Sequence, residues 1–143
     1  PLDREKISIL SSLLKTENEE TGIDNSGMIT ACQIQCMADG NAYSLAIRHA
    51  GFLNAESSTE HRCEVRLITE HGTIGIFGAI VAENFDETGG KIHIFGEHIA
   101  LFENSTIDAS SENGGGTISI GCADGSRLAE TILIDEEVVI SAD

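Results

Sequence analysis

The chain has 143 residues and a mass of 15.2 kDa, long enough for one domain with a core of its own. Its 24 acidic against 8 basic side chains give a formal charge of −16 and a pI near 4.4. This charge excludes nucleic acid as a partner, because phosphate backbones require clustered Lys and Arg. No apolar run approaches the roughly 20 residues that span a bilayer, which argues against membrane insertion, and no targeting signal is recognised. The start at Pro1 suggests a trimmed or excised piece.

The composition favours strands over helices. Isoleucine is the dominant apolar residue, and the single proline stands at the first position, where it interrupts no strand. β-Branched side chains suit a pleated surface, and proline would break its hydrogen-bond ladder. The 15 glycines indicate many tight turns. We therefore expect an all-β protein.

Residues 1–22 differ from the rest of the chain. Ile7, Leu10, Leu13 and Leu14 have helical spacing, and a charged stretch follows them. We expect residues 1–22 to form either a helical cap over the first coil of a repeat domain or a linker. The repeats themselves are assigned to residues 23–143.

One pattern recurs along the remaining chain: an apolar residue, any residue, then alanine. The alanines are separated by 24, 27, 27 and 33 residues. The apolar residues that precede them are Ile29, Leu53, Ile80, Ile107 and Ile140. Such self-similarity is the sequence signature of a repeat architecture.

A second alternating segment lies between successive copies, and its matching apolar positions are Cys36, Leu67, Ile94 and Ile120. Alternation predicts that these residues point inward and that His93 points outward. Three short strands in each repeat of about 27 residues, with no helical pattern between them, predict a parallel β-solenoid of about five coils. An antiparallel sandwich is the alternative, but a sandwich gives no reason for one ladder to repeat.

Glycines mark the connections between strands. The two clearest stretches contain Gly89, Gly90, Gly114, Gly115 and Gly116. We expect these glycines to supply the positive φ angles of sharp corners. They are not a phosphate-binding loop, because no Lys-Ser/Thr pair and no helix follow them.

The segments from Gly89 to Phe102 and from Ile107 to Gly121 resemble the repeat region of filamentous-haemagglutinin-like large exoproteins. That family carries a "GGxVxIxG…IxLxxxxxIDASG…GGGxIxIGG" pattern, which residues 91–96 and 113–121 follow closely. Cys122 departs from it, at a position where the family more often has glycine. The resemblance covers residues 22–143, and the family's amino-terminal secretion domain is not in this sequence.

The resemblance implies a right-handed parallel β-helix within a long chain exported by two-partner secretion, located outside the cell or on its outer surface. It implies a structural shaft segment of an adhesin, with neighbouring β-helix coils as its partners and a host surface or glycan as a further candidate partner. The competing functions are a β-helix carbohydrate-active enzyme and a glycan-binding module.

The chemically reactive residues form no recognised motif. Zinc sites need closely paired ligands, and the four cysteines have no CxxC spacing. Cys32 and Cys36 lie too far apart along a strand for a disulfide. A disulfide between cysteines at stacked corners is an alternative that the sequence does not decide. The histidines are assigned to turns or outward faces. We therefore expect no catalytic residue, no metal site and no cofactor.

Carboxylates on one outward face would be needed for polysaccharide cleavage. Asp108 is aligned with Thr30, Asn54, Val81 and Ser141, so no acidic cluster forms at this ladder position. The sequence therefore predicts a protein that is not an enzyme. Because the last ladder residues reach almost to Asp143, we also expect an uncovered final coil and end-to-end self-association.

Overall fold

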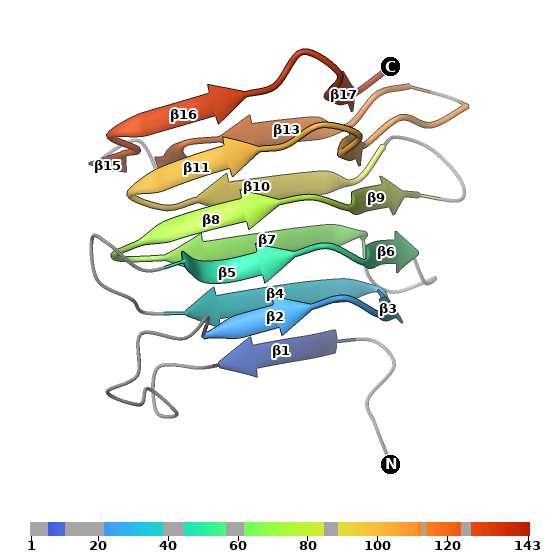
Figure 1. Cartoon of the computed structure of the whole chain (residues 1–143). Coiled ribbons are helices and arrows are strands. Elements are labelled where there is room, and N and C mark those ends of the chain that lie inside the picture. Colours follow the sequence, from blue (N-terminus) through green and yellow to red (C-terminus); the bar gives the residue numbers. More distant parts are fainter. Residues whose placement is uncertain are drawn as a thin grey trace.

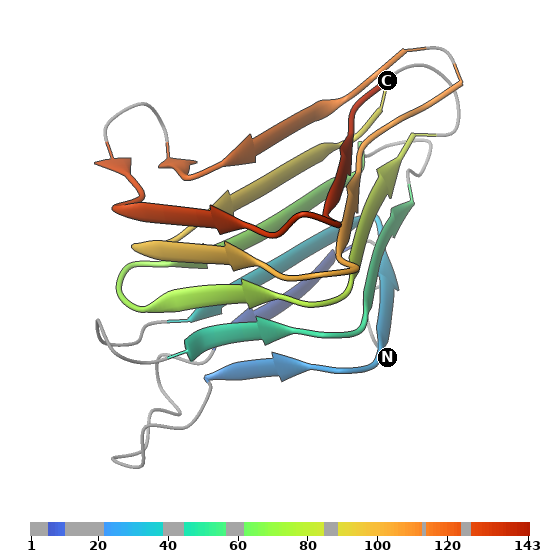
Figure 2. The same ribbon diagram turned by 45° about the horizontal axis from the view of Figure 1, so that its top comes forward.

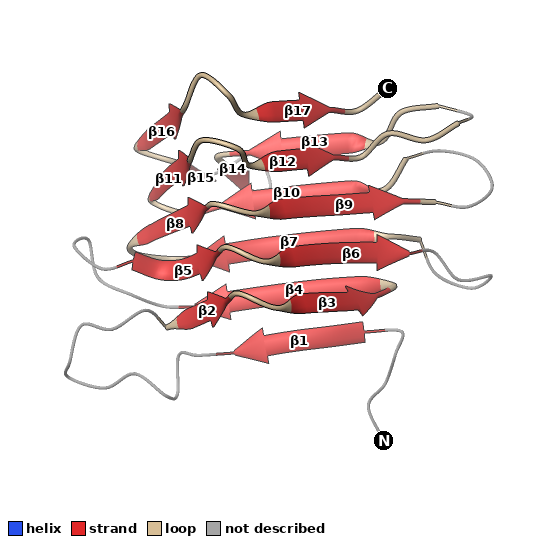
Figure 3. Ribbon diagram, turned by 45° about the vertical axis from the view of Figure 1, so that its right-hand side comes forward, coloured by secondary structure: helices blue, strands red, loops and turns tan. Residues whose placement is uncertain are grey.

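The structure, a computed structural model, describes residues 6–10, 22–38, 45–56, 62–84, 89–112, 114–123 and 127–143. These residues contain strands, turns and loops, and no helix occurs among them (Figures 1 and 3). Three parallel sheets have five strands each, and two further strands form a short antiparallel hairpin. The predicted all-β parallel solenoid is therefore confirmed. No helix in the described part of the chain is long and apolar enough to cross a membrane.

Each sheet collects one strand from every turn of the chain. The first sheet contains β1 (Lys6–Leu10), β4 (Gln33–Ala38), β7 (Glu64–Thr69), β10 (Lys91–Phe95) and β13 (Thr117–Ile120). The second sheet contains β2 (Ile23–Asn25), β5 (Leu45–His49), β8 (Thr73–Ile76), β11 (His98–Leu101) and β16 (Thr131–Ile134). The third sheet contains β3 (Met28–Ala31), β6 (Phe52–Glu56), β9 (Ala79–Glu83), β12 (Thr106–Asp108) and β17 (Val139–Ser141). The hairpin consists of β14 (Cys122–Ala123) and β15 (Arg127–Leu128).

The chain visits the three sheets in the same order on each turn, and we call three consecutive strands, one from each sheet, a coil. For example, β4, β5 and β6 form one coil, and β7, β8 and β9 form the next. Figure 2 shows the three sheets surrounding a shared interior. The β14–β15 hairpin is inserted between β13 and β16 of the last coil. This insertion explains why the last repeat is longer than the others.

The core follows the alternation of the strands. In β10, Ile92 and Ile94 are fully buried, whereas Lys91 is exposed and His93 half-buried on the outer side. β7 has the same pattern, with Val65 fully buried among its inward residues. Burying one such aliphatic side chain contributes about 1.5–3 kcal/mol. Stacked aliphatic side chains therefore stabilise the interior.

The prediction of a helical cap over residues 1–22 is wrong for the part of it that the structure describes. Residues 6–10 form β1, which pairs in parallel with β4, with Ile7 opposite Ile34 and Ile9 opposite Cys36. The Ile7–Ile9 alternation has a period of two, and β-branched residues favour strands. An existing sheet edge gives such a segment hydrogen-bond partners that an isolated short helix lacks.

The corner glycines are required mainly by close contact between coils. Of the five predicted positions, Gly114 has a positive φ of 146°. At Gly89, a Cβ atom would instead collide with the backbone oxygen of Ala109 and the backbone nitrogen of Gly116. Of the five glycines, the expected positive φ angle is therefore found at Gly114 alone. Close approach of stacked backbones explains Gly89.

Candidate functional site

The first predicted ladder runs through the first sheet. Cys36, Leu67, Ile94 and Ile120 occupy paired positions in β4, β7, β10 and β13. Cys36, Leu67 and Ile94 are buried, whereas Ile120 is only partly buried and packs against the edge of the core. Burial raises the pKa of the Cys36 thiol to about 11. This position is therefore an apolar element of the stack and not a reactive thiolate.

The second predicted ladder runs through the third sheet. Ile29, Leu53, Ile80, Ile107 and Ile140 occupy paired positions from β3 to β17. Leu53, Ile80 and Ile107 are buried in the middle of the ladder, whereas Ile140 is 42% exposed. An isoleucine in the same register is therefore buried in the middle coils and exposed to solvent in the last coil. This loss of burial shows that the last coil exposes residues that the middle coils bury.

Two residues of β16 share the situation of Ile140. Ile132 and Ile134 pair with Ile99 and Leu101, both of which are buried, yet they remain 42% and 53% exposed. We call Ile132, Ile134 and Ile140 the open end. Their side chains belong to the inward ladders, but no later coil covers them among the described residues.

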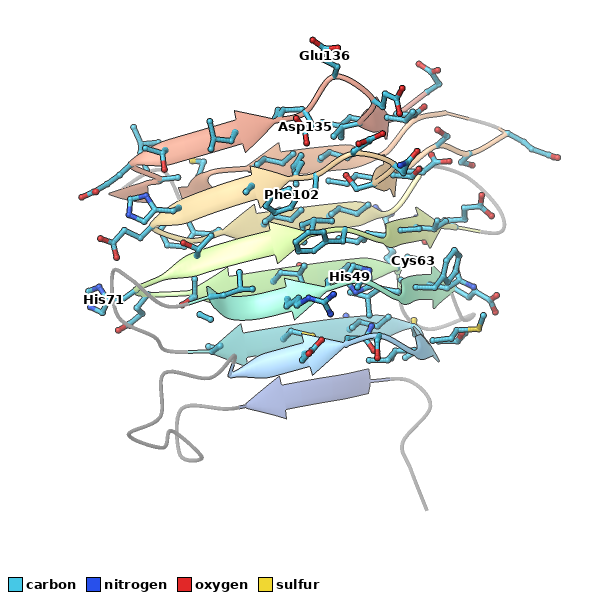
Figure 4. The ribbon with its side chains drawn as sticks, viewed as in Figure 1. His49, Cys63, His71, Phe102, Asp135 and Glu136 are labelled. Atoms are coloured by element: carbon cyan, nitrogen blue, oxygen red, sulfur yellow. The ribbon has the colours of Figure 1, made fainter. Side chains whose placement is uncertain are left out.

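The backbone at the open end is also an edge. β13, β16 and β17 are the outermost strands of their three sheets, and the stack in Figure 1 ends with β16 and β17. Exposed carboxylates surround it, and Figure 4 labels Asp135 and Glu136 in the connection between these two strands. An apolar centre, free strand edges and an acidic rim therefore coincide. This combination can accept another β-coil of suitable charge.

A shallow groove of about 380 Å³ lies on the outer face of the first sheet. At its polar side, Glu64 Oε1 is 3.8 Å from both Arg66 Nε and His93 Nε2. Phe95 and Ile68 line its apolar side. Arg66 Nε is buried and makes no hydrogen bond. The groove thus combines an apolar surface with the charged side chains of Glu64 and Arg66.

The four cysteines are free thiols in this structure. Cys63 Sγ donates a hydrogen bond to the Glu83 carbonyl over 2.8 Å, and the Cys63 N–H donates to Asn84 Oδ1 over 3.0 Å. Cys32 Sγ lies 3.8 Å from the Arg62 carbonyl. The buried cysteines therefore serve as small packing groups at strands and corners.

The prediction that the histidines occupy turns or outward faces is wrong for His49. This residue is 1% exposed, and its ring bridges three coils (Figure 4). Its Nε2 lies 2.8 Å from the Ala79 carbonyl, and its Nδ1 lies 3.1 Å from Asn25 Nδ2. A neutral ring that donates from Nε2 and accepts at Nδ1 satisfies both contacts. Desolvation lowers the pKa of His49, and the hydrogen bond to Ala79 opposes this shift.

The other described histidines lie at the surface. His93 is on the outer face of the first sheet, whereas His71 and His98 lie at the corner between the first and second sheets. His61 lies outside the described residues. The missed signal for His49 is a polar pair at repeat spacing, because Asn25 precedes it by 24 residues and occupies the paired strand position.

Asp108 has a local structural contact. Its Oδ1 accepts hydrogen bonds from the Ser110 N–H over 2.8 Å and from the Ser110 hydroxyl over 2.5 Å. Its paired neighbours are Val81 and Ser141. The carboxylate therefore stabilises the turn after β12 and has no acidic partner at this ladder position.

Comparison with protein-family models, with curated proteins and with solved structures finds no match to this chain. What is established is the β-solenoid fold. The likeness to the exoprotein repeat pattern remains a resemblance carried by the residues quoted above.

Proposed function

We propose that this chain is a structural shaft segment of a secreted or cell-surface exoprotein of the filamentous haemagglutinin type. Its right-handed β-helix joins neighbouring coils of a longer chain and separates functional tips from the cell. One observation carries the proposal. The open end presents the inward ladders, in register, to a coil that would complete their burial.

The energetics favour such an extension. Ile132, Ile134 and Ile140 are each about half exposed, and covering all three would contribute roughly 2–4 kcal/mol, since full burial of one such side chain contributes about 1.5–3 kcal/mol. Pairing of the three edge strands would add backbone hydrogen bonds. The preference for right-handed crossovers between parallel strands supports the proposed handedness.

A tandem fusion tests whether the stack can be extended. In the first copy, Ala31 and Cys32 lead into β4, which starts at Gln33. Joining residues 33–143 directly after Asp143 lets the Ala142–Asp143 pair lead into a second β4 in the same way. The fused chain should form one rod, longer by roughly 19 Å for four added strands per sheet at ~4.8 Å each.

Small-angle scattering and thermal unfolding supply the measurements. We expect one cooperative transition at a higher temperature than that of the single copy. The control is the same fusion with Ile132→Asp and Ile140→Asp at the junction, which should separate into two units. Two independent units in the unmodified fusion would refute the shaft proposal.

The proposed role is not enzymatic. The full chain should release no reducing or unsaturated ends from polysaccharides. Activity that is lost when a single Asp is replaced would overturn this part of the proposal.

Glycan binding is the second candidate function, and the outer groove of the first sheet favours it. Arg66 and His93 could donate to sugar hydroxyl or carboxylate groups beside the apolar face of Phe95. A glycan array probed with the full chain tests this function. Specific binding that is lost in Arg66→Ala but kept in Arg48→Ala, a change outside the groove, would favour a binding module over a shaft.

A further inference from the structure

The corners between the first and second sheets stack on one another. Glu97 lies between β10 and β11, and Glu130 occupies the matching place before β16. The Glu130 N–H donates a hydrogen bond to the Glu97 carbonyl over 2.8 Å. One coil earlier, the Gly72 carbonyl accepts from the His98 N–H over 3.2 Å. Side chains from successive coils are therefore held side by side.

Three potential metal ligands meet at this corner. Glu97, His98 and Glu130 each offer one ligand atom, and these atoms lie within 4.8 Å of one another. His98 Nε2 is 3.9 Å from Glu97 Oε1. In a tetrahedral site with bonds of about 2.1 Å, donor atoms lie about 3.4 Å apart. Closure around an ion therefore requires small rotations, and Glu130 is exposed and free to make the largest one.

Two of the three candidate ligands, His98 and Glu97, are oriented by hydrogen bonds to neighbouring residues. His98 Nδ1 is 2.7 Å from Thr131 Oγ1, and in the tautomer whose Nδ1–H donates there, Nε2 keeps its lone pair. Glu97 Oε2 accepts from the Gly72 N–H over 3.3 Å, which leaves Oε1 on the side of His98. Such second contacts are typical of metal ligands, because they fix the ring and carboxylate orientation.

A fourth group lies next to the cluster. His71 Nδ1 is 3.6 Å from Glu97 Oε2, and Figure 4 shows His71 at the same corner of the fold. The side chains of Glu97 and His98 are only 20% and 28% exposed, so they are partly withdrawn from bulk water. An imidazole and two carboxylates without thiolate are suited to a divalent transition metal ion.

We propose that Glu97, His98 and Glu130 bind a divalent transition metal ion, with Zn²⁺ as a suitable ion, and that this ion fastens the last coil to the coil before it. Glu97 and His98 belong to the inner coil, whereas Glu130 leads directly into β16. The ion thus bridges the boundary at which burial of the ladders is lost. A ligand that binds only the folded corner stabilises the fold by mass action.

The sequence contains this site without a recognisable motif. Glu97 and His98 are adjacent, but Glu130 follows 33 residues after Glu97, in the last repeat, which the β14–β15 hairpin lengthens. A search for closely spaced ligands therefore misses it. The expectation of no metal site rested on the lack of closely spaced ligands in the sequence. The stacking of corners instead brings together ligands that are far apart in the sequence.

Calorimetric titration of the full chain with ZnCl₂ tests the proposal. We expect one ion per chain, a higher melting temperature by circular dichroism, and slower amide hydrogen exchange in residues 131–134. Glu130→Gln and His98→Ala should each weaken Zn²⁺ binding by about 10-fold or more. Glu130→Gln changes an exposed side chain, so its fold should persist and its far-ultraviolet spectrum should match that of the parent.

Matched controls separate this corner from other zinc-binding groups. His93→Ala and Glu137→Gln should bind Zn²⁺ as the parent does. Co²⁺ in place of Zn²⁺ should give absorption bands without thiolate charge transfer, because no cysteine is a ligand. The proposal is overturned by absent stoichiometric binding, by binding insensitive to both ligand variants, by thiolate-dependent binding, or by equally tight binding of Ca²⁺ that survives His98→Ala.

Discussion

The middle coils and the last coil carry the same alternation but differ in burial. Ile80 and Ile107 are fully buried, whereas Ile140, in the next strand of the same ladder, is 42% exposed. Nothing in their local pattern distinguishes these residues. The difference arises because a residue in a solenoid is buried by the coils on both sides of it. The stability of a position therefore depends on its place in the stack.

The largest expected effect comes from truncating a middle ladder residue. Ile94→Ala should lower the free energy of unfolding by about 2–5 kcal/mol, because the fully buried ladder cannot fill the cavity. Ile134→Ala should cost only about 1 kcal/mol, since this side chain is 53% exposed. His93→Ala, on the outer face, is the control and should change little. Urea unfolding provides the midpoints, and equal midpoints for Ile94→Ala and Ile134→Ala would contradict the comparison.

The ladders were predictable from the sequence because their information is local. A period of two assigns Ile94 inward and His93 outward, and the repeat spacing aligns Leu67 with Ile94. Burial at the ends was harder to predict, since it depends on neighbours that lie a whole coil away. The strand at residues 6–10 was missed because Leu10, Leu13 and Leu14 suggested a helix, while the sheet edge that selects the strand is absent from any local pattern.

The polar contacts were less predictable than the core. Both ring nitrogens of His49 have hydrogen-bond partners, Asn25 and Ala79, which belong to the coils on either side. Glu97 and Glu130 come together through corner stacking. Sequence periodicity reports the faces of strands, but it does not report the direction in which a corner side chain turns.

Glycine replacement should also distinguish the middle of the stack from its end. Gly27, Gly51 and Gly78 precede β3, β6 and β9 at matching corners. A Cβ at Gly78 would collide with the backbone of Gly51, whereas a Cβ at Gly27 would lie 4.0 Å from the nearest atom among the residues that the structure describes. Gly78→Ala should therefore destabilise by about 1–3 kcal/mol.

Gly27→Ala is the matched control. It should be neutral or stabilise by up to about 1 kcal/mol, because it reduces the entropy of the unfolded chain. Thermal unfolding of the two variants measures the difference. Similar losses at both positions would mean that the corner conformation, and not the contact between coils, requires glycine.

A smaller effect should follow from the pH dependence of the buried His49. Its pKa is lowered in the folded protein, so the unfolded chain binds more protons at this group below its unperturbed pKa of about 6.5. The contribution of His49 to stability is complete above that pH. It is lost as the pH falls below about 6.5, by up to ~1.4 kcal/mol per pH unit, until the folded ring itself protonates.

His49→Gln removes this titration while keeping a polar side chain. Urea unfolding at several pH values between 5 and 8 should show a steeper loss of stability in the parent than in His49→Gln. His93→Gln, the same replacement of a histidine on the outer face, serves as the control. Identical slopes in the parent and His49→Gln would contradict the assignment of a buried neutral ring.

The weakest expected effect is association through the open end. At −16 per chain, two copies repel each other at long range, and salt reduces this repulsion as the Debye length falls from ~10 Å at 0.1 M to ~3 Å at 1 M. Apolar contact between open ends is not screened by salt. We therefore expect pairs or short end-to-end oligomers to increase with salt, and as the pH approaches the pI near 4.4.

Neighbouring residues of β16 provide a strict control for this association. Ile132 continues the inward ladder, whereas Leu133 pairs with Ala100 on the outer side and is 70% exposed. In sedimentation velocity at 1 M salt, Ile132→Asp should remain monomeric and Leu133→Asp should associate like the parent, although both variants add one negative charge. If both variants lost association equally, charge alone would control it. A parent that stays monomeric at 1 M salt and pH 5 would show that the acidic rim protects the last coil even when long-range repulsion is screened.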